Sequence, residues 1–266
     1  MKKRIFIALL LVAAAWAAGR HMTRTDSAGD AAARGDIHRT FELQPGARVE
    51  VHSINGPVTV ETSETDVAEI HVTRTARDPG DAVEQKILID HDATSLVVRG
   101  ERGGGRGFWR WFFGGGGGRS AETRVALKLP RRVEFEAHGV NGAVTIGEVD
   151  GLLTLRGVNG RVEARQTEGR AKVSGTNGGV LLTFARVGEK GVEVSGVNGR
   201  VQFRLGAEAA ADIAGHGVNG GFNVTIPGAT VERERHGTRF SARVGAGGPR
   251  VEISGVNGDI SFERAN

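Results

Sequence analysis

The sequence contains no cysteine and only 6 prolines among its 266 residues. A disulfide framework, a thiolate metal site, a thiol nucleophile and a lipidated N-terminal cysteine are therefore excluded, and stability must come from packing and backbone hydrogen bonds. Glycine, in contrast, is abundant, with 42 residues that recur at fixed offsets among Val, Ile, Leu and Phe. This spacing is typical of turns in a folded all-β protein rather than of a flexible linker.

No long hydrophobic run is present that would span a bilayer comfortably, because the apolar run Ile5–Ala15 is shorter than the roughly 20 residues required. A basic head at residues 2–4 precedes this run, and small residues follow it. These features predict a signal peptide over residues 1–18, cleaved after Ala17 or Ala18, and export to the periplasm or the cell surface. An uncleaved N-terminal anchor is the alternative.

Charge of one sign is not in large excess. Removal of the three basic residues of the signal segment lowers the formal charge of the chain from +4 to about +1. This near balance gives no support for a nucleic-acid partner, and none is expected.

The pair Asn-Gly marks a repeat that dominates the chain. Seven copies are present: Asn55-Gly56, Asn141-Gly142, Asn159-Gly160, Asn177-Gly178, Asn198-Gly199, Asn219-Gly220 and Asn257-Gly258. Successive spacings are 86, 18, 18, 21, 21 and 38 residues. The last spacing is close to two periods, and Gly237-Thr238 lies where a further, degenerate copy would fall. We interpret each Asn-Gly pair as a tight turn that requires positive φ.

The residues that flank each turn alternate between apolar and polar. Counted from each Asn, positions −6, −4, +3 and +5 are mostly apolar, which predicts two half-buried strands per copy. An ordinary antiparallel hairpin is one interpretation. The other interpretation is a parallel β-solenoid with coils of about 18–21 residues, apolar positions in register and an internal ladder of stacked Asn side chains. The uniform phase of the copies favours the solenoid.

The presence and regularity of the repeat divide the chain after the signal peptide into three segments. Residues 19–36 are small, polar and aperiodic, and we interpret them as a flexible linker. Residues 37–130 are predicted to form irregular β-coils, either about four of them in the 86-residue gap or a separate sheet, with a Gly-rich aromatic insert at 103–118. Residues 131–266 are predicted to form the regular solenoid.

In its Asn-Gly repeat the chain resembles the bacterial putative-adhesin family of β-strand-repeat proteins, long catalogued as a domain of unknown function. The resemblance extends from about Phe41 onward and is most specific in the ending, where residues 247–253 lead into Gly255-Val256-Asn257-Gly258-Asp259-Ile260. It implies an exported β-solenoid and brings no established catalytic residues. The insert around Trp109 departs from the family pattern.

Two features could carry chemistry. The insert presents five aromatic residues between glycine tethers: Phe108, Trp109, Trp111, Phe112 and Phe113. It could contact a partner protein or a membrane surface, or it could cap an end of the solenoid. Position −3 carries His52, His138, Arg156, Ser174, Ser195, His216 and Ser254. Its three histidines belong to the first, second and sixth copies, so stacking would not bring all three together, and a solvated polar face is favoured over a metal site.

These observations predict a non-enzymatic module of the cell envelope, without cofactor or metal, that binds an envelope protein, a polymer or a surface. A periplasmic accessory or scaffold protein in envelope stress or signalling is the alternative. A polysaccharide-acting enzyme on a β-helix is a minor alternative, since the acidic residues are scattered and no nucleophile elbow, phosphate loop or His-Glu-x-x-His motif is present.

Overall fold

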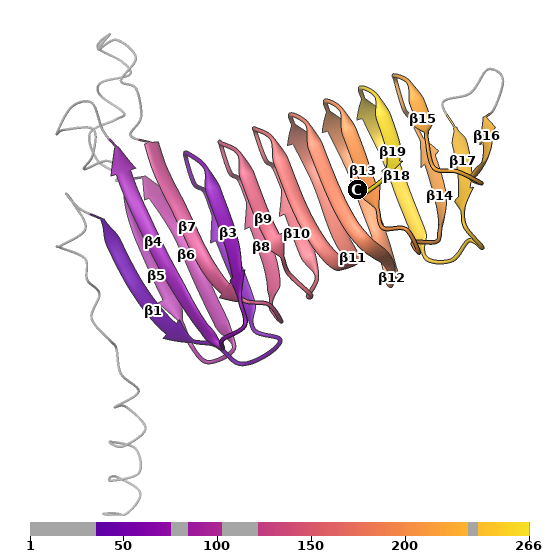
Figure 1. Cartoon of the computed structure of the whole chain (residues 1–266). Helices are drawn as coiled ribbons and strands as arrows, with labels where there is room; N and C mark the ends of the chain where they lie inside the picture. Colours follow the sequence, from indigo (N-terminus) through magenta and orange to yellow (C-terminus); the bar gives the residue numbers. More distant parts are fainter. Residues whose placement is uncertain (1–35, 76–84, 103–121, 234–238, 266) are drawn as a thin grey trace, which may run out of the picture.

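A computed structural model of the chain describes residues 36–75, 85–102, 122–233 and 239–265. All regular structure in these ranges is β-strand, and the strands form one connected sheet of mixed orientation that folds back around a single apolar core (Figure 1). No helix long and apolar enough to cross a membrane is found in the described ranges.

The first strands of the chain are β1 (Ile37–Glu42), β2 (Arg48–His52), β3 (Val58–Ser63), β4 (Val67–Thr75), β5 (Gln85–His91), β6 (Ser95–Arg102), β7 (Glu122–Pro130), β8 (Glu134–His138) and β9 (Val144–Glu148). The remaining strands are β10 (Leu153–Arg156), β11 (Val162–Asn177), β12 (Val180–Asn198), β13 (Val201–Leu205), β14 (Ala211–His216), β15 (Phe222–Val224), β16 (Thr230–Arg233), β17 (Phe240–Val244), β18 (Arg250–Asn257) and β19 (Ile260–Arg264).

Strands on the two sides of an Asn-Gly turn pair with the equivalent strands of other copies and not with each other. We call the two strands that flank one turn a rung and name it by its Asn. In the Asn55 rung, β2 pairs in parallel with β6 and β8, whereas β3 pairs in parallel with β7 and β9. The long strands β11 and β12 each end one rung and begin the next. The antiparallel hairpin therefore does not describe these turns.

The 86-residue gap between Asn55 and Asn141 contains the strand pair β6–β7, which we also call a rung although no Asn-Gly joins its strands, and a set of antiparallel strands. β6 and β7 stack on the Asn55 rung, while β5 runs antiparallel to β6. β4 runs antiparallel to β7, and β1 runs antiparallel to β4. The prediction of about four irregular coils in this gap was wrong, because the chain reverses and covers the end of the stack.

Spatial order departs from chain order at the other end. β18 pairs in parallel with both β12 and β14, and β19 with both β13 and β15. The Asn257 rung therefore lies between the Asn198 and Asn219 rungs, as the yellow strands show in Figure 1. Gly237 and Thr238 lie outside the described residues, but β16 and β17 on either side of them pair antiparallel. The expectation of a further parallel copy there was wrong.

The core includes the positions that the repeat predicts. Side chains at −6, −4, +3 and +5 are buried in the rungs within the stack. Phe222 and Val224 are only partly buried, because the Asn219 rung has a neighbour on one side of its second strand only. Position −1 is also buried, which the alternation of apolar and polar residues does not predict.

The turn geometry confirms the interpretation of Asn-Gly in part. A further residue with positive φ lies at −2, with φ of 59–66° at six glycines and 55° at Ser53. No described Asn of the repeat has positive φ. Five of the seven glycines after Asn have φ of 145–159°. The glycines after Asn also permit close stacking: a Cβ on Gly160 would lie 2.4 Å from the carbonyl oxygen of Gly142, and the same contact recurs from rung to rung.

Replacement of Gly160 with Ala is expected to lower the free energy of unfolding by about 1–3 kcal/mol, because two backbones must separate to admit a methyl group. Gly179→Ala is the matched control, since a Cβ on Gly179 would lie 3.8 Å from its nearest neighbour atom. Denaturant unfolding measures both variants, and equal stability of the two would contradict the close-stacking role.

Thr176 occupies a position −1 that is Ile or Val in the six other rungs. Its side chain is 1% exposed, and its hydroxyl has no hydrogen-bond partner among the described residues. Thr176→Val should therefore raise the free energy of unfolding by about 1 kcal/mol, because it removes a buried unsatisfied hydroxyl at constant shape. Thr176→Ser retains the hydroxyl and should not stabilise; a destabilised Thr176→Val variant would refute the argument.

Candidate binding groove

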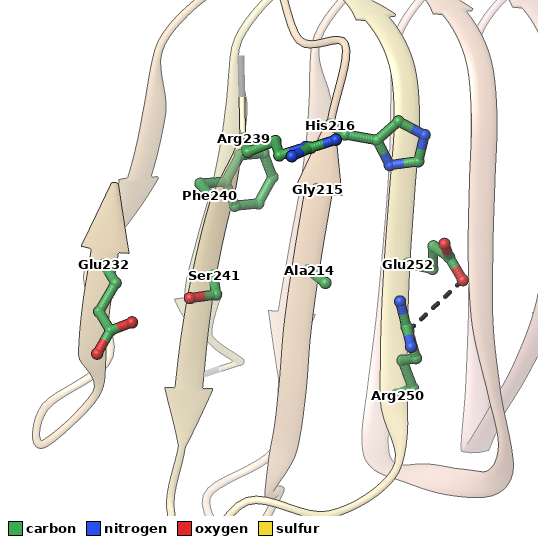
Figure 2. Close-up of a pocket in the computed structure, with 9 residues that line it drawn as sticks. All are labelled: Ala214, Gly215, His216, Glu232, Arg239, Phe240, Ser241, Arg250 and Glu252. Carbon is green, nitrogen blue, oxygen red and sulfur yellow. Dashed lines mark ion pairs between the residues drawn. The ribbon is translucent and has the colours of Figure 1, made fainter. Parts of the chain in front are cut away.

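Two adjoining hollows lie on the outer face of the strands around the Asn219 rung. One, of about 580 Å³, is lined by Ala214, Gly215, His216, Glu232, Arg239, Phe240, Ser241, Arg250 and Glu252 (Figure 2). The other, of about 610 Å³, is lined by Asp212, Ile213, Ala214, Thr230, Glu232, Ser241, Ala242, Arg243, Gly248 and Arg250. Because the two share four lining residues, we treat them as one groove across β14, β16, β17 and β18.

Short side chains form the floor of the groove and long ones form its walls. Ser241 of β17 is the register partner of Ala214 of β14. Glu232 of β16 flanks Ser241 on one side, and Glu252 of β18 flanks Ala214 on the other. Figure 2 shows the small side chains of Ser241 and Ala214 between these longer ones. The depression thus follows directly from side-chain length along one row of the sheet.

An aromatic contact beneath the floor holds β17 against β14. Gly215 pairs with Phe240, and a Cβ on Gly215 would lie 2.0 Å from the Phe240 ring. The same ring stacks on Phe222 at a centroid distance of 3.7 Å. A residue larger than glycine at 215 would displace this ring and with it the floor.

The groove carries both signs of charge. Arg250 and Glu252 form an ion pair of 3.5 Å on β18. Asp212 accepts hydrogen bonds from Arg243 Nε at 3.0 Å and from the backbone N–H of Gly248 at 3.1 Å, and these bonds lower the pKa of its carboxyl group. Glu232 and Arg239 add one further charge of each sign to the lining of the groove.

The three histidines of the −3 column do not meet. His52 and His138 are register partners whose ring centroids lie 5.9 Å apart, and His52 Nε2 lies 2.7 Å from Glu50 Oε2. His216 lines the groove beside Ser254 at the other end of the stack. The described residues contain no group of three or more His, Asp or Glu side chains that could hold a metal ion.

An arginine ties the first two rungs together beside these histidines. Arg48 pairs with Glu50 and with Glu136, at 2.6 Å in each case. The hydrogen bond to Glu136 and the charge of Glu50 raise the pKa of the Arg48 guanidinium. This cluster is a network of paired charges on a solvated face.

The Asn side chains form the predicted ladder, but it lies on the solvent side of the turns and is not internal as expected. Each Nδ2 donates to the Oδ1 of the neighbouring Asn at 2.8–3.3 Å, in the spatial order Asn55, Asn141, Asn159, Asn177, Asn198, Asn257, Asn219. The glycines that follow these residues are the close-stacking positions described above. The ladder aligns the rungs.

The aromatic residues Phe108, Trp109, Trp111, Phe112 and Phe113 lie outside the described residues. The strands before and after this segment, β6 and β7, form the rung next to Asn55. The groove was not predicted from the sequence. Two features of the sequence could have indicated the groove: the 38-residue spacing between the last two Asn-Gly pairs, and Gly215 in place of an apolar residue at −4 of the sixth copy.

Comparisons with known proteins show only a limited similarity between this chain and other proteins. No model of a known protein family matches the chain, and no curated protein matches it. The resemblance to the putative-adhesin family is therefore not confirmed.

Solved structures do match in part. A putative cell adhesion protein from Clostridium sporogenes ATCC 15579 is 10% identical, with a TM-score of 0.38, over 87% of this chain and 100% of that one. A putative adhesin from Bacteroides fragilis NCTC 9343 is 13% identical, with a TM-score of 0.32, over 87% and 98%. One from Parabacteroides merdae ATCC 43184 is 14% identical, with a TM-score of 0.25, over 87% and 96%. Likeness of this extent does not establish a shared family or function.

The Asp212 carboxyl group should titrate below its usual pKa in an NMR pH titration, because Arg243 and the Gly248 N–H stabilise its charged form. This contribution to stability is present above the unfolded-state pKa and is lost as the pH falls through the folded-state value. Arg243→Met should raise the pKa toward normal. Arg204→Met, which removes another exposed guanidinium, should not; an unchanged Asp212 titration in Arg243→Met would refute the assignment.

Proposed function

We propose that this protein is a non-enzymatic, exported β-solenoid that binds a component of the cell envelope through the groove on β14, β16, β17 and β18. The observation that carries the proposal is the continuity of the two hollows, which share Ala214, Glu232, Ser241 and Arg250. A groove of this kind suits an extended, polar ligand that lies across the strands.

The solenoid interpretation is supported by the pairing of copies. Val162, for example, pairs in parallel with Val144 on one side and with Val180 on the other, one repeat away in each direction. Like residues thus stack on like, as in a repeat protein whose units contact only their neighbours. The antiparallel strands at the two ends then serve as caps that cover the stack.

Such a stack gives the groove a rigid support. The parallel ladders continue on both faces from the β6–β7 rung to the Asn219 rung, and each rung is fixed to the next by backbone and Asn side-chain bonds. Sites built on strands keep their geometry better than sites on loops. We therefore assign recognition to the outer face rather than to the Asn-Gly turns.

Export and the division of the chain are also part of the proposal. The basic head and apolar run at residues 2–15 support a signal peptide over residues 1–18 with cleavage after Ala17 or Ala18, followed by a linker to residue 36. The periplasm and the cell surface are both compatible destinations. The aromatic insert around Trp109 and Trp111 is a second proposed contact, to a partner or to a membrane surface.

Replacement of Ser241 with Trp should fill the groove and lower retention of the protein on peptidoglycan sacculi or envelope membrane vesicles, prepared from the cells that express it, by about tenfold. Thr145→Trp is the matched control, because Thr145 is an exposed, outward-facing strand residue of β9 far from the groove. Trp109→Ser/Trp111→Ser, in the same pull-down, tests the insert. If Ser241→Trp binds both fractions as the unmodified protein does, the groove is not the contact site.

Protease treatment of intact cells separates the two locations. Degradation of the protein would support a surface binding module. Protection in intact cells, together with degradation after the envelope is opened, would support the periplasmic accessory or scaffold role and exclude surface adhesion.

A further inference from the structure

The Asn257 rung, formed by β18 and β19, is seated between two rungs that precede it in the chain. Its neighbours, the Asn198 and Asn219 rungs, lie at 192–205 and 211–224. The stack therefore contains a slot that residues 250–264 fill from the side. We call this segment the inserted rung and the two flanking rungs its seat.

One wall of the seat recognises the inserted rung through specific side chains. The ring of Phe262 stacks on that of Phe203, with centroids 4.4 Å apart and planes within 6°. Glu263 Oε1 accepts hydrogen bonds from Arg204 Nε at 2.7 Å and from Gln202 Nε2 at 2.6 Å. These contacts select this rung from the other rungs of the repeat.

The opposite wall also makes contacts that depend on sequence. Asp259 Oδ1 accepts a hydrogen bond from the backbone N–H of Gly221 at 2.9 Å. Asn257 joins the two halves of the ladder, because it donates to Asn198 at 3.3 Å and accepts from Asn219 at 3.2 Å. The rung is thus matched to both walls at once.

Burial adds to this recognition. The core-facing side chains of the inserted rung, Val251, Ile253, Val256, Ile260 and Phe262, are all 0–1% exposed. An empty seat would expose this core and leave the facing edges of the Asn198 and Asn219 rungs without their backbone partners. Such edges pair readily with another strand of suitable pattern.

A short hinge connects the inserted rung to the strand before it. β17 ends at Val244 and β18 begins at Arg250, and the hinge between them contains Gly245, Gly247 and Gly248 at φ of 60°, 78° and 150°. Fully extended, five residues reach roughly 17 Å. An open hinge would therefore carry the rung away from its own seat.

We propose that the inserted rung is an exchangeable element, and that the seat of one molecule accepts the rung of a second copy of this chain. The second copy supplies the same Phe262, Glu263 and Asp259 contacts, and only the path of the hinge differs. Reciprocal exchange gives a closed two-fold dimer, which leaves no seat empty. The inference is independent of the ligand that the groove binds.

Single cysteines test the exchange, because the chain has none of its own. Ser195 of β12 and Ser254 of β18 are register partners across the seat. A full-length chain with Ser195→Cys is mixed with a full-length, larger-tagged chain with Ser254→Cys, partly unfolded together, refolded at high concentration and oxidised. Exchange places the two thiols side by side and should yield a disulfide-linked mixed dimer on a non-reducing gel.

The control is a mixture of the Ser254→Cys chain with a Thr145→Cys chain, whose thiols can meet only by collision. The Ser195–Ser254 mixture should form mixed dimer about tenfold above this control, because seating raises the effective concentration of the thiols. A chain that carries both Ser195→Cys and Ser254→Cys, oxidised while folded, should lock its own rung and form no dimer. Mixed dimer at the control level would overturn the proposal.

Discussion

The approach of neighbouring backbones at the Asn-Gly turns constrains the whole stack. At each turn, the position of a Cβ on the glycine lies 2.2–2.4 Å from a carbonyl oxygen of the adjacent rung, so only glycine fits. The Asn beside it can then reach its neighbour, and six side-chain hydrogen bonds join the seven rungs. A one-residue slip between strands would turn every core side chain toward solvent. Close approach at the turn therefore keeps Val, Ile and Phe in register on both faces.

Because equivalent residues of different rungs stack on one another, the repeat alone does not determine the order of the rungs in space. Any rung of the repeat could pair with any other, since all present the same backbone and the same Asn-Gly turn. The order is decided by contacts between residues far apart in the chain, above all Phe203 with Phe262 and Glu263 with Arg204. Gly215 contributes from the next rung, because the space that it leaves is filled by Phe240 of an antiparallel strand. Without that ring, another parallel rung would find the same edge available.

The sequence therefore predicted the buried positions of each rung well, but not the order in which the rungs pair. Alternation identified the buried residues at −6, −4, +3 and +5, and the Asn ladder followed from their uniform phase. Positive φ was predicted for the Asn-Gly pair and occurs at five of its seven glycines, but the positive φ at −2 and the close packing of the glycine at +1 were not predicted. The position of Asn257 between Asn198 and Asn219, and the antiparallel β16–β17 pair, depend on pairwise contacts that periodicity does not encode. The groove depends on the same contacts and was missed for the same reason.

Function in such a protein is best sought at the ends of the stack. A middle rung has a neighbour on each side, so a longer turn or a lost core residue disturbs two ladders at once. An end rung disturbs one, and it is at the ends that this chain departs from its repeat. At one end, residues 103–121 separate β6 from β7, where the other rungs have two to five residues between their strands. At the other, Gly215 and the short side chains of Ala214 and Ser241 interrupt the pattern, and the groove lies there. Because the ladder keeps the middle rungs uniform, these departures are where the chain has room for a specific binding surface.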